Sequence, residues 1–248
     1  MISALSPAWP APLGVCAYFT TRHGGTSVGA YTSLNLATHV GDDPAAVAAN
    51  RARLSQALVL PSAPRWLAQI HGAQAVEVTR PTATPPVADA AWTSARNVVC
   101  AVLTADCLPI LLCNLTGTKV AAIHAGWRGL AGGVIANTCE KFAAAGPWIA
   151  WIGPGIGPQA YAVGVDLRER FLALDEAYAE AFHYAEGAWH ANLARIAHHQ
   201  LQRAGATNIA TYAGYTDSQP AEFPSFRRDG VCGRFASLIW ISEETPQC

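Results

Sequence analysis

Short apolar runs separated by turn-forming residues recur along the 248-residue chain, and they predict strands interspersed with single helices. The most informative stretch is 104–130, where one apolar run ends at a turn and another begins directly after it. We expect 109–114 and 119–124 to form a hairpin closed around Thr116 and Gly117, in which paired residue numbers sum to about 233. Cys107 then pairs with position 126.

In this hairpin His124 lies two residues from the partner of Cys107, and therefore on the same face of the sheet. The two side chains become diagonal neighbours, roughly 7–8 Å apart at Cα. A slip of one residue would send them to opposite faces.

The rest of the chain gives an alternation of strands and helices. Strands are expected at 14–20, 97–103, 148–152, 161–165, 207–213 and 235–241, with two short ones around His71 and Gly72 within 65–79. Helices are expected at 44–58 after the Asp43–Pro44 start signal, from about Gly126, at 166–183 capped by Asp166, and at 189–204 ended by Gly205. Neighbouring hairpin strands mixed with single helices predict an α+β fold with mixed sheets, in a single domain spanning 1–248.

Composition narrows the class of protein. Apolar residues make up 51% of the chain and charged residues 13%, which indicates a compact globular protein, and the net charge is −1. The absence of a basic patch argues against a nucleic-acid partner. No run approaches the roughly 18 apolar residues of a membrane span, and the first residues do not resemble a signal peptide. We expect a cytoplasmic enzyme for a small-molecule substrate, as a monomer or weak homodimer.

The seven cysteines are scattered, odd in number and without CxxC pairs. That pattern is typical of buried thiols or metal ligands rather than of a disulfide framework. Cys100 and Cys113 lie inside apolar runs and are expected in the core.

Three residues at strand ends are candidate metal ligands, namely His71, Cys107 and His124. One thiolate and two imidazoles suit zinc, and three protein ligands leave a fourth position for water or substrate. Their spacings of 36 and 17 residues match no short zinc motif, so each is also compatible with an ordinary core or turn position.

The alternative chemistry needs no metal. Cys107 would act as a nucleophile with His124 as its base. Asp106 could orient either arrangement, although an Asp before a turn more often caps backbone amides. A multicopper oxidase site is disfavoured, because such sites use many histidines, commonly as HxH pairs, and this chain has eight histidines and no HxH.

Several loops could bind an anion. Arg128 lies where a strand passes into a helix, and a helix N-terminus beside an arginine favours phosphate. Arg22 and Asn35 lie in the long polar segment 21–43, and loops of that length are usually functional. Arg227 and its neighbour Arg228 lie in another polar loop. Each arginine is equally compatible with a solvated surface position.

Ordered motifs along nearly the whole chain resemble the YfiH or laccase-domain family, also called polyphenol oxidase. They are TRHGGTS, SLNLATHVGDDP, NR at 50–51, QIHG, DAAWT, TADCLPI, HAGWRGL, IGPGIGP, YAVG, SFRRDG and GR at 233–234. The resemblance implies a four-layer αββα sandwich related to the cysteine-hydrolase-like fold of a bacterial toxin domain. It also implies zinc held by His71, Cys107 and His124.

The activities implied by the resemblance are phosphorolysis of adenosine, inosine, guanosine and methylthioadenosine, and deamination of adenosine. Some members edit peptidoglycan precursors, and some have been called laccases. We therefore expect a zinc-dependent purine nucleoside phosphorylase with adenosine deaminase activity, with Arg22, Asn35, Arg128 and Arg227 binding substrate. The alternatives are a cysteine-hydrolase-like editing enzyme, a laccase-like polyphenol oxidase, or a zinc-stabilised binding module.

The chain departs from the family pattern at two places. Tyr215–Thr216 replaces the usual Cys-Thr, and Phe223–Pro224–Ser225 replaces Phe-Phe-Ser. Both flank the loop that carries Arg227. Of the roles that the resemblance implies, substrate binding by this loop therefore has the weakest match in the sequence.

Overall fold

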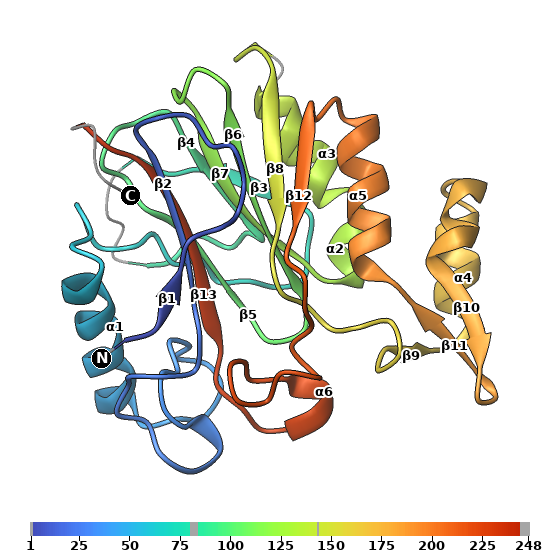
Figure 1. Cartoon of the computed structure of the whole chain (residues 1–248), viewed down its shortest axis with the longest axis horizontal. Helices are drawn as coiled ribbons and strands as arrows, with labels where there is room; N and C mark the ends of the chain where they lie inside the picture. Colours follow the sequence, from blue (N-terminus) through green and yellow to red (C-terminus); the bar gives the residue numbers. More distant parts are fainter. Residues whose placement is uncertain (1, 80–83, 143, 244–248) are drawn as a thin grey trace.

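The computed structural model describes residues 2–79, 84–142 and 144–243. Its largest sheet has six strands in the order β12-β8-β6-β7-β4-β3. Their bounds are β3 Ala75–Glu77, β4 Ala90–Thr93, β6 Leu108–Asn114, β7 Val120–Ala125, β8 Trp148–Ile152 and β12 Asn208–Thr211. The pairs β3–β4 and β8–β12 are parallel and the others antiparallel, so the sheet is mixed (Figure 1).

A second sheet of four strands packs against the first. It has the order β1-β2-β13-β5, with β1 Ala4–Leu5, β2 Val15–Thr20, β5 Cys100–Thr104 and β13 Phe235–Ile241. The helices of the main body are α1 Pro44–Ala57, α2 Trp127–Gly132, α3 Val134–Cys139, α5 Leu193–Arg203 and the short α6 Phe226–Asp229.

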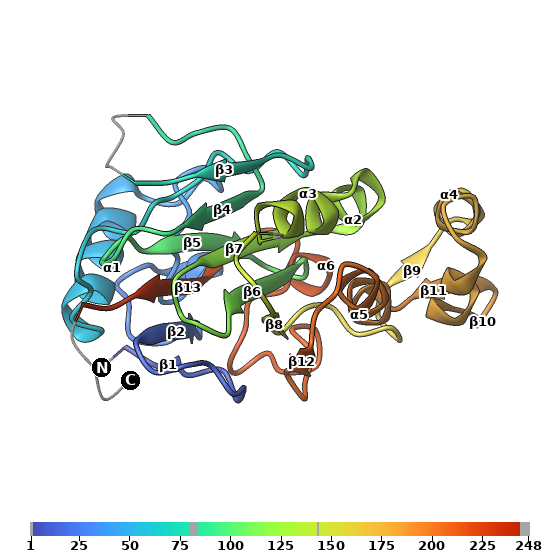
Figure 2. The ribbon, with the colours of Figure 1, turned by 90° about the horizontal axis from the view of Figure 1, so that it is seen from above.

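Alternation along the strands assigns side chains to successive layers. In β6, Ile110 and Leu112 face a core shared with α2, α3 and α5, whereas Leu111 and Cys113 face the other sheet. In β13, Leu238 joins a third core with residues of α1. Three cores between successive layers give the arrangement helix–sheet–sheet–helix (Figure 2). The four-layer α+β expectation is confirmed.

The hairpin of β6 and β7 has the predicted register. Leu108 pairs with Ala125 and Pro109 with His124, so the paired residue numbers sum to 233. The turn contains Gly117 at φ +66°, a conformation that glycine adopts without penalty. The predicted helix start is also confirmed. Asp43 is the N-cap, its carboxylate accepts a hydrogen bond from the Ala45 amide, and Pro44 is the first residue of the helix.

The helix predicted at 166–183 is wrong beyond Leu172. Helix α4 spans Val165–Leu172, a 3₁₀ turn follows at Glu176–Ala181, and β10 runs over Phe182–Ala185. The side chain of Asp175 accepts the Ala177 amide, which starts the new turn in a stretch without Gly or Pro. Asp166 lies in the first turn of α4, whose N-cap is Gly164.

The helix predicted at 189–204 begins too early. Residues Ala188–Ala191 form strand β11, which pairs with β10 around Glu186 and Gly187, both at positive φ. Helix α5 starts at Leu193, after Asn192 caps it. Strands β10, β11 and β9 (Ala162–Val163) make a small sheet beside the main body (Figure 1, right).

In the stretch 65–79 only β3 is a strand, and Arg65 and Ala68 make isolated bridges. Within the described ranges, no helix has the length and apolar character needed to cross a membrane.

Candidate functional site

The ends of three segments bring together the predicted trio His71, Cys107 and His124. Cys107 directly precedes β6 and His124 lies in β7, while His71 sits in a turn at φ +59°. Their ligand atoms all lie within 4.8 Å of one another, and the two imidazole rings are 4.8 Å apart at 77°. These three donors can hold a metal ion. His124 is buried, Cys107 half-buried and His71 exposed, so the site opens on the His71 side.

The start of α2 forms the floor of the site. A Cβ on Gly126 would lie 2.8 Å from the Cys107 Sγ and 3.3 Å from the His71 ring. Any side chain there would displace the donors, and this steric limit explains why position 126 is a glycine.

Asp89, fully buried at the start of β4, supports both histidines from behind. One carboxylate oxygen lies 2.8 Å from Nδ1 of His124 and also accepts the His71 amide at 2.9 Å. The other accepts the Gly72 amide at 2.6 Å. A carboxylate behind a ligating histidine fixes the ring orientation and raises its basicity, and this leaves Nε2 of His124 for the metal. The sequence analysis did not select Asp89.

The electrostatics favour an ionised thiol. Burial alone would raise the pKa of Cys107, but His124 and His71 lower it to about 6. Burial alone would lower the pKa of His124, but Cys107 and Asp89 raise it to about 9. By contrast, burial raises the pKa of the core thiols Cys113 and Cys139 to about 12. Among these three thiols, the thiolate needed for metal binding or for nucleophilic attack is therefore favoured at Cys107.

The trio opens into a cavity of about 460 Å³. Arg128 and Arg227, two of the residues expected to bind substrate, line it. The guanidinium of Arg128 stacks on the Trp127 ring at 4.4 Å and makes no hydrogen bond to the residues that the structure describes. The guanidinium of Arg227 lies 5.0 Å from the Tyr161 ring centre.

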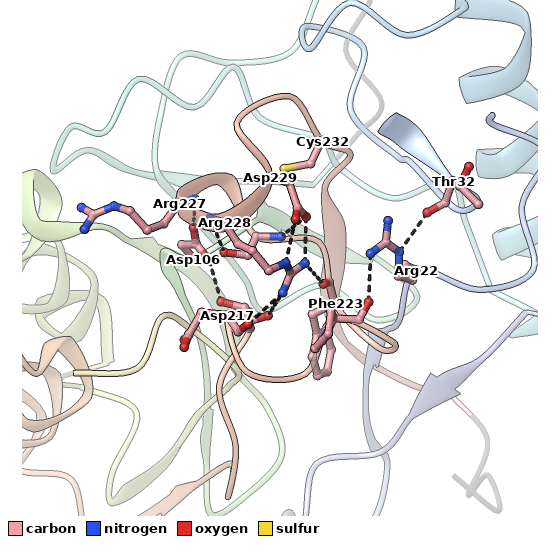
Figure 3. Close-up of polar contacts among 12 residues, drawn as sticks. Arg22, Thr32, Asp106, Asp217, Phe223, Arg227, Arg228, Asp229 and Cys232 are labelled. Atoms are coloured by element: carbon pink, nitrogen blue, oxygen red, sulfur yellow. Dashed lines mark hydrogen bonds and ion pairs between the residues drawn. The ribbon is translucent and has the colours of Figure 1, made fainter. Parts of the chain in front are cut away.

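Arg22 and Asn35 lie outside the cavity lining. Arg22 donates to the carbonyls of Thr32 at 3.0 Å and Pro220 at 2.9 Å. Figure 3 shows it on the opposite side of the 225–230 turn from Arg227. Asn35 is buried, and its Oδ1 accepts the backbone amide of Arg234. Its contact with the cavity is thus indirect.

The lining residues that the sequence did not single out include His39, Tyr161, Phe226 and Arg234. All lie within motifs quoted for the resemblance, which was the available signal. Arg234 lies 5.7 Å from the Phe226 ring, so the cavity repeats an arginine–aromatic pairing. Burial, Arg234 and Arg51 lower the pKa of His39, which favours the neutral ring.

Fold and site together define a four-layer protein with a His–Cys–His centre in an arginine-lined cavity. The profile of the family described as multi-copper polyphenol oxidoreductase laccase matches residues 16–242, and the chain belongs to this family. The resemblance read from the motifs is confirmed.

Relatives cover almost the whole chain. Purine nucleoside phosphorylase YfiH of Shigella flexneri is 44% identical over 242 residues, covering 97% of this chain and 100% of that protein. Purine nucleoside phosphorylase PA4543 of Pseudomonas aeruginosa is 43% identical over 242 residues, covering 96% and 98%. Purine nucleoside phosphorylase SCO2081 of Streptomyces coelicolor is 36% identical, covering 90% and 94%.

Solved structures share the fold. Protein NMB0706 of Neisseria meningitidis superposes with a TM-score of 0.92 at 43% identity, covering 97% of this chain and 99% of that one. YlmD from Geobacillus stearothermophilus gives 0.86 at 30% identity, covering 97% of each.

Proposed function

We propose that this chain is a zinc-dependent purine nucleoside phosphorylase with adenosine deaminase activity. Its substrates would be adenosine, inosine, guanosine, methylthioadenosine and phosphate. The observation that carries the proposal is the convergence of His71, Cys107 and His124 in a cavity with free guanidinium donors. The names of the relatives, purine nucleoside phosphorylases, support the same reaction. We further propose that the protein acts in the cytoplasm as a monomer or weak homodimer, without nucleic-acid or membrane partners.

The donor set fits zinc. One thiolate and two imidazoles are ligands that zinc accepts, and three protein ligands are typical of catalytic zinc. His71, Cys107 and His124 would hold the ion, with Asp89 orienting His124. When bound, zinc supplies a Lewis acid and lowers the pKa of water at its open position.

Arg128 is the proposed phosphate-binding arginine. Stacking on Trp127 holds its guanidinium at the cavity while its N–H groups stay free of hydrogen bonds to the described residues. A planar guanidinium binds phosphate through two parallel hydrogen bonds. Arg227 is a second proposed contact, although its Nη1 already donates to the carbonyls of Ala160 and Ala162.

The purine is proposed to lie against the aromatic lining. Phe226 is 58% exposed beside the cavity, so one apolar ring is available for stacking with a heteroaromatic base. Burial raises the pKa of Tyr161 to about 12, so its hydroxyl remains a donor. The neutral ring of His39 can donate or accept a hydrogen bond with the base or the ribose.

A second function is favoured by one specific observation. Cys107, His124 and Asp89 also form a nucleophile–base–carboxylate series, with a thiol pKa lowered to about 6. This series would serve a metal-independent cysteine hydrolase that edits a cell-wall precursor. The laccase-like oxidase is supported by the description of the family, whereas no contact in the site favours it or the zinc-stabilised binding module.

Removal of the metal distinguishes these functions. We expect the purified protein to contain about one zinc per chain and little copper. Dialysis against a chelator should abolish nucleoside turnover, and added zinc should restore it. A metal-free protein with full nucleoside turnover would contradict zinc dependence and favour metal-independent chemistry at Cys107. Copper that restores oxidation of phenols would favour the laccase. Zinc-loaded protein that turns over no nucleoside would favour the binding module or the cell-wall editing enzyme.

A further inference from the structure

Asp106 adopts a backbone conformation that is rare for a residue with a Cβ. Its φ is +88°, it is buried, and it directly precedes Cys107. Asp and Asn tolerate positive φ better than most residues, but the conformation persists only where surrounding contacts fix it. The contacts of Asp106 therefore identify what this position is built to hold.

Asp106 joins three segments that are distant in sequence. One carboxylate oxygen accepts the Thr216 hydroxyl at 2.6 Å, and the other accepts the backbone amide of Arg227 at 2.6 Å (Figure 3). Its carbonyl accepts the Ile156 amide at 2.8 Å, and a Cβ on Gly155 would lie 3.0 Å from that carbonyl. Both carboxylate oxygens thus bind the protein itself.

Arg228 closes the same loop on itself. Its side chain donates to the carbonyls of Thr216 at 2.8 Å and Phe223 at 2.9 Å, and to both carboxylate oxygens of Asp229. Its amide donates to the Ser225 hydroxyl. Figure 3 shows this guanidinium at the centre of the network. Arg228 therefore ties the 225–230 turn to the segment 216–223 that precedes it.

The adjacent residues point the other way. Arg227 and Phe226 line the cavity with the metal trio, and Figure 3 shows the Arg227 side chain leaving the network. The position of this cavity wall relative to Cys107 therefore depends on the carboxylate of Asp106, one residue before the thiol.

We propose that Asp106 is a positioning residue that docks the 225–230 turn beside Cys107, so that Phe226 and Arg227 close the cavity on an aromatic base and an anion. The inference rests on the proposed function for the identity of these ligands. Asp106 is part of the cavity lining, but both of its carboxylate oxygens are engaged by Thr216 and Arg227, so its role is to position the turn rather than to act in the chemical step.

Replacing Asp106 with Gly tests this role, because glycine relieves the positive φ and removes both acceptors. With zinc-loaded protein we expect KM for inosine and phosphate to rise roughly tenfold or more, with kcat and zinc content little changed. Asp106→Asn should raise KM less, since its carbonyl oxygen can accept the Arg227 amide and its NH₂ can donate to Thr216. Thr216→Val removes one of the two bonds and should raise KM by a smaller factor.

Three results would overturn the proposal: an unchanged KM in Asp106→Gly, an equal loss in Asp106→Asn, or a loss of zinc in Asp106→Gly. If Asp106→Gly does not fold, an unchanged KM in Thr216→Val overturns it. Hydrogen exchange of the 225–230 peptide separates this inference from the proposed function. In Asp106→Gly we expect faster exchange of this peptide than in the wild-type protein and an unchanged exchange rate in β7. This result is expected even if the wild-type protein turns over no nucleoside. Unchanged exchange would show that Asp106 does not fix the turn.

Discussion

Replacing Cys107 with Ala is expected to remove the zinc and to lower nucleoside turnover at least about a thousandfold. The size of the loss follows from the several kcal/mol of transition-state stabilisation that a metal ion supplies. Cys107 contributes the single thiolate of the trio, and alanine leaves two imidazoles, one of them exposed. The fold should survive, because the three cores between the layers do not include Cys107. Metal analysis and thermal unfolding of the same sample check both statements.

Two further variants serve as controls for this result. Cys139→Ala changes a buried thiol of α3 outside the cavity and should retain zinc and turnover. Asp89→Asn keeps all three ligands but replaces the carboxylate behind His124 with a neutral amide. Zinc affinity should therefore fall about 10- to 100-fold. Cys107→Ala protein that retains full zinc would show that the ligand assignment is wrong.

Replacing Arg128 with Lys is expected to raise the KM for phosphate roughly 10- to 150-fold, the effect of losing about 1.5–3 kcal/mol of charge-assisted hydrogen bonding. Lysine keeps the charge but lacks the planar fork that binds two phosphate oxygens together. Zinc content and adenosine deamination should be largely retained, because neither requires phosphate. Steady-state kinetics with varied phosphate measure the change.

The other predicted arginines provide the comparison. Arg227→Lys should raise the KM for phosphate less than Arg128→Lys, because Arg227 already donates to two carbonyls. Arg22→Lys should change it by less than about twofold, as for a residue outside the cavity. Unchanged phosphate dependence at 22, 128 and 227 together would remove the anion site from the proposal.

The trio was within reach of the sequence because two of its members lie on one hairpin. An apolar run, a Thr–Gly turn and a second apolar run favour one register, and that register brings His124 to the side of Cys107. His71 was selected because it also lies at the end of an expected strand, and the motifs that resemble the family then supported all three residues. The helix at 166–183 was not within reach, because no Gly or Pro marks its end at Leu172 and the strand that follows depends on pairing with β11.

Asp89 shows why the rest of the site was missed. Its partner His124 lies 35 residues away, and an Asp before an apolar strand is not distinguished in sequence from one that caps a turn. The loop arginines posed a similar problem. Arg22 lies in a polar loop and Arg128 where a strand passes into a helix, and neither local sequence shows whether the guanidinium is free. Folding brings the Pro220 carbonyl, 198 residues away, to the guanidinium of Arg22. Which donors remain free is decided by these long-range contacts.

The most direct test of phosphorolysis is product analysis of inosine incubated with the zinc-loaded protein, with and without phosphate. We predict hypoxanthine and ribose 1-phosphate in equal amounts, formed only when phosphate is present. Release of hypoxanthine at an equal rate without phosphate, together with free ribose, would contradict the proposed phosphorylase and show hydrolysis instead.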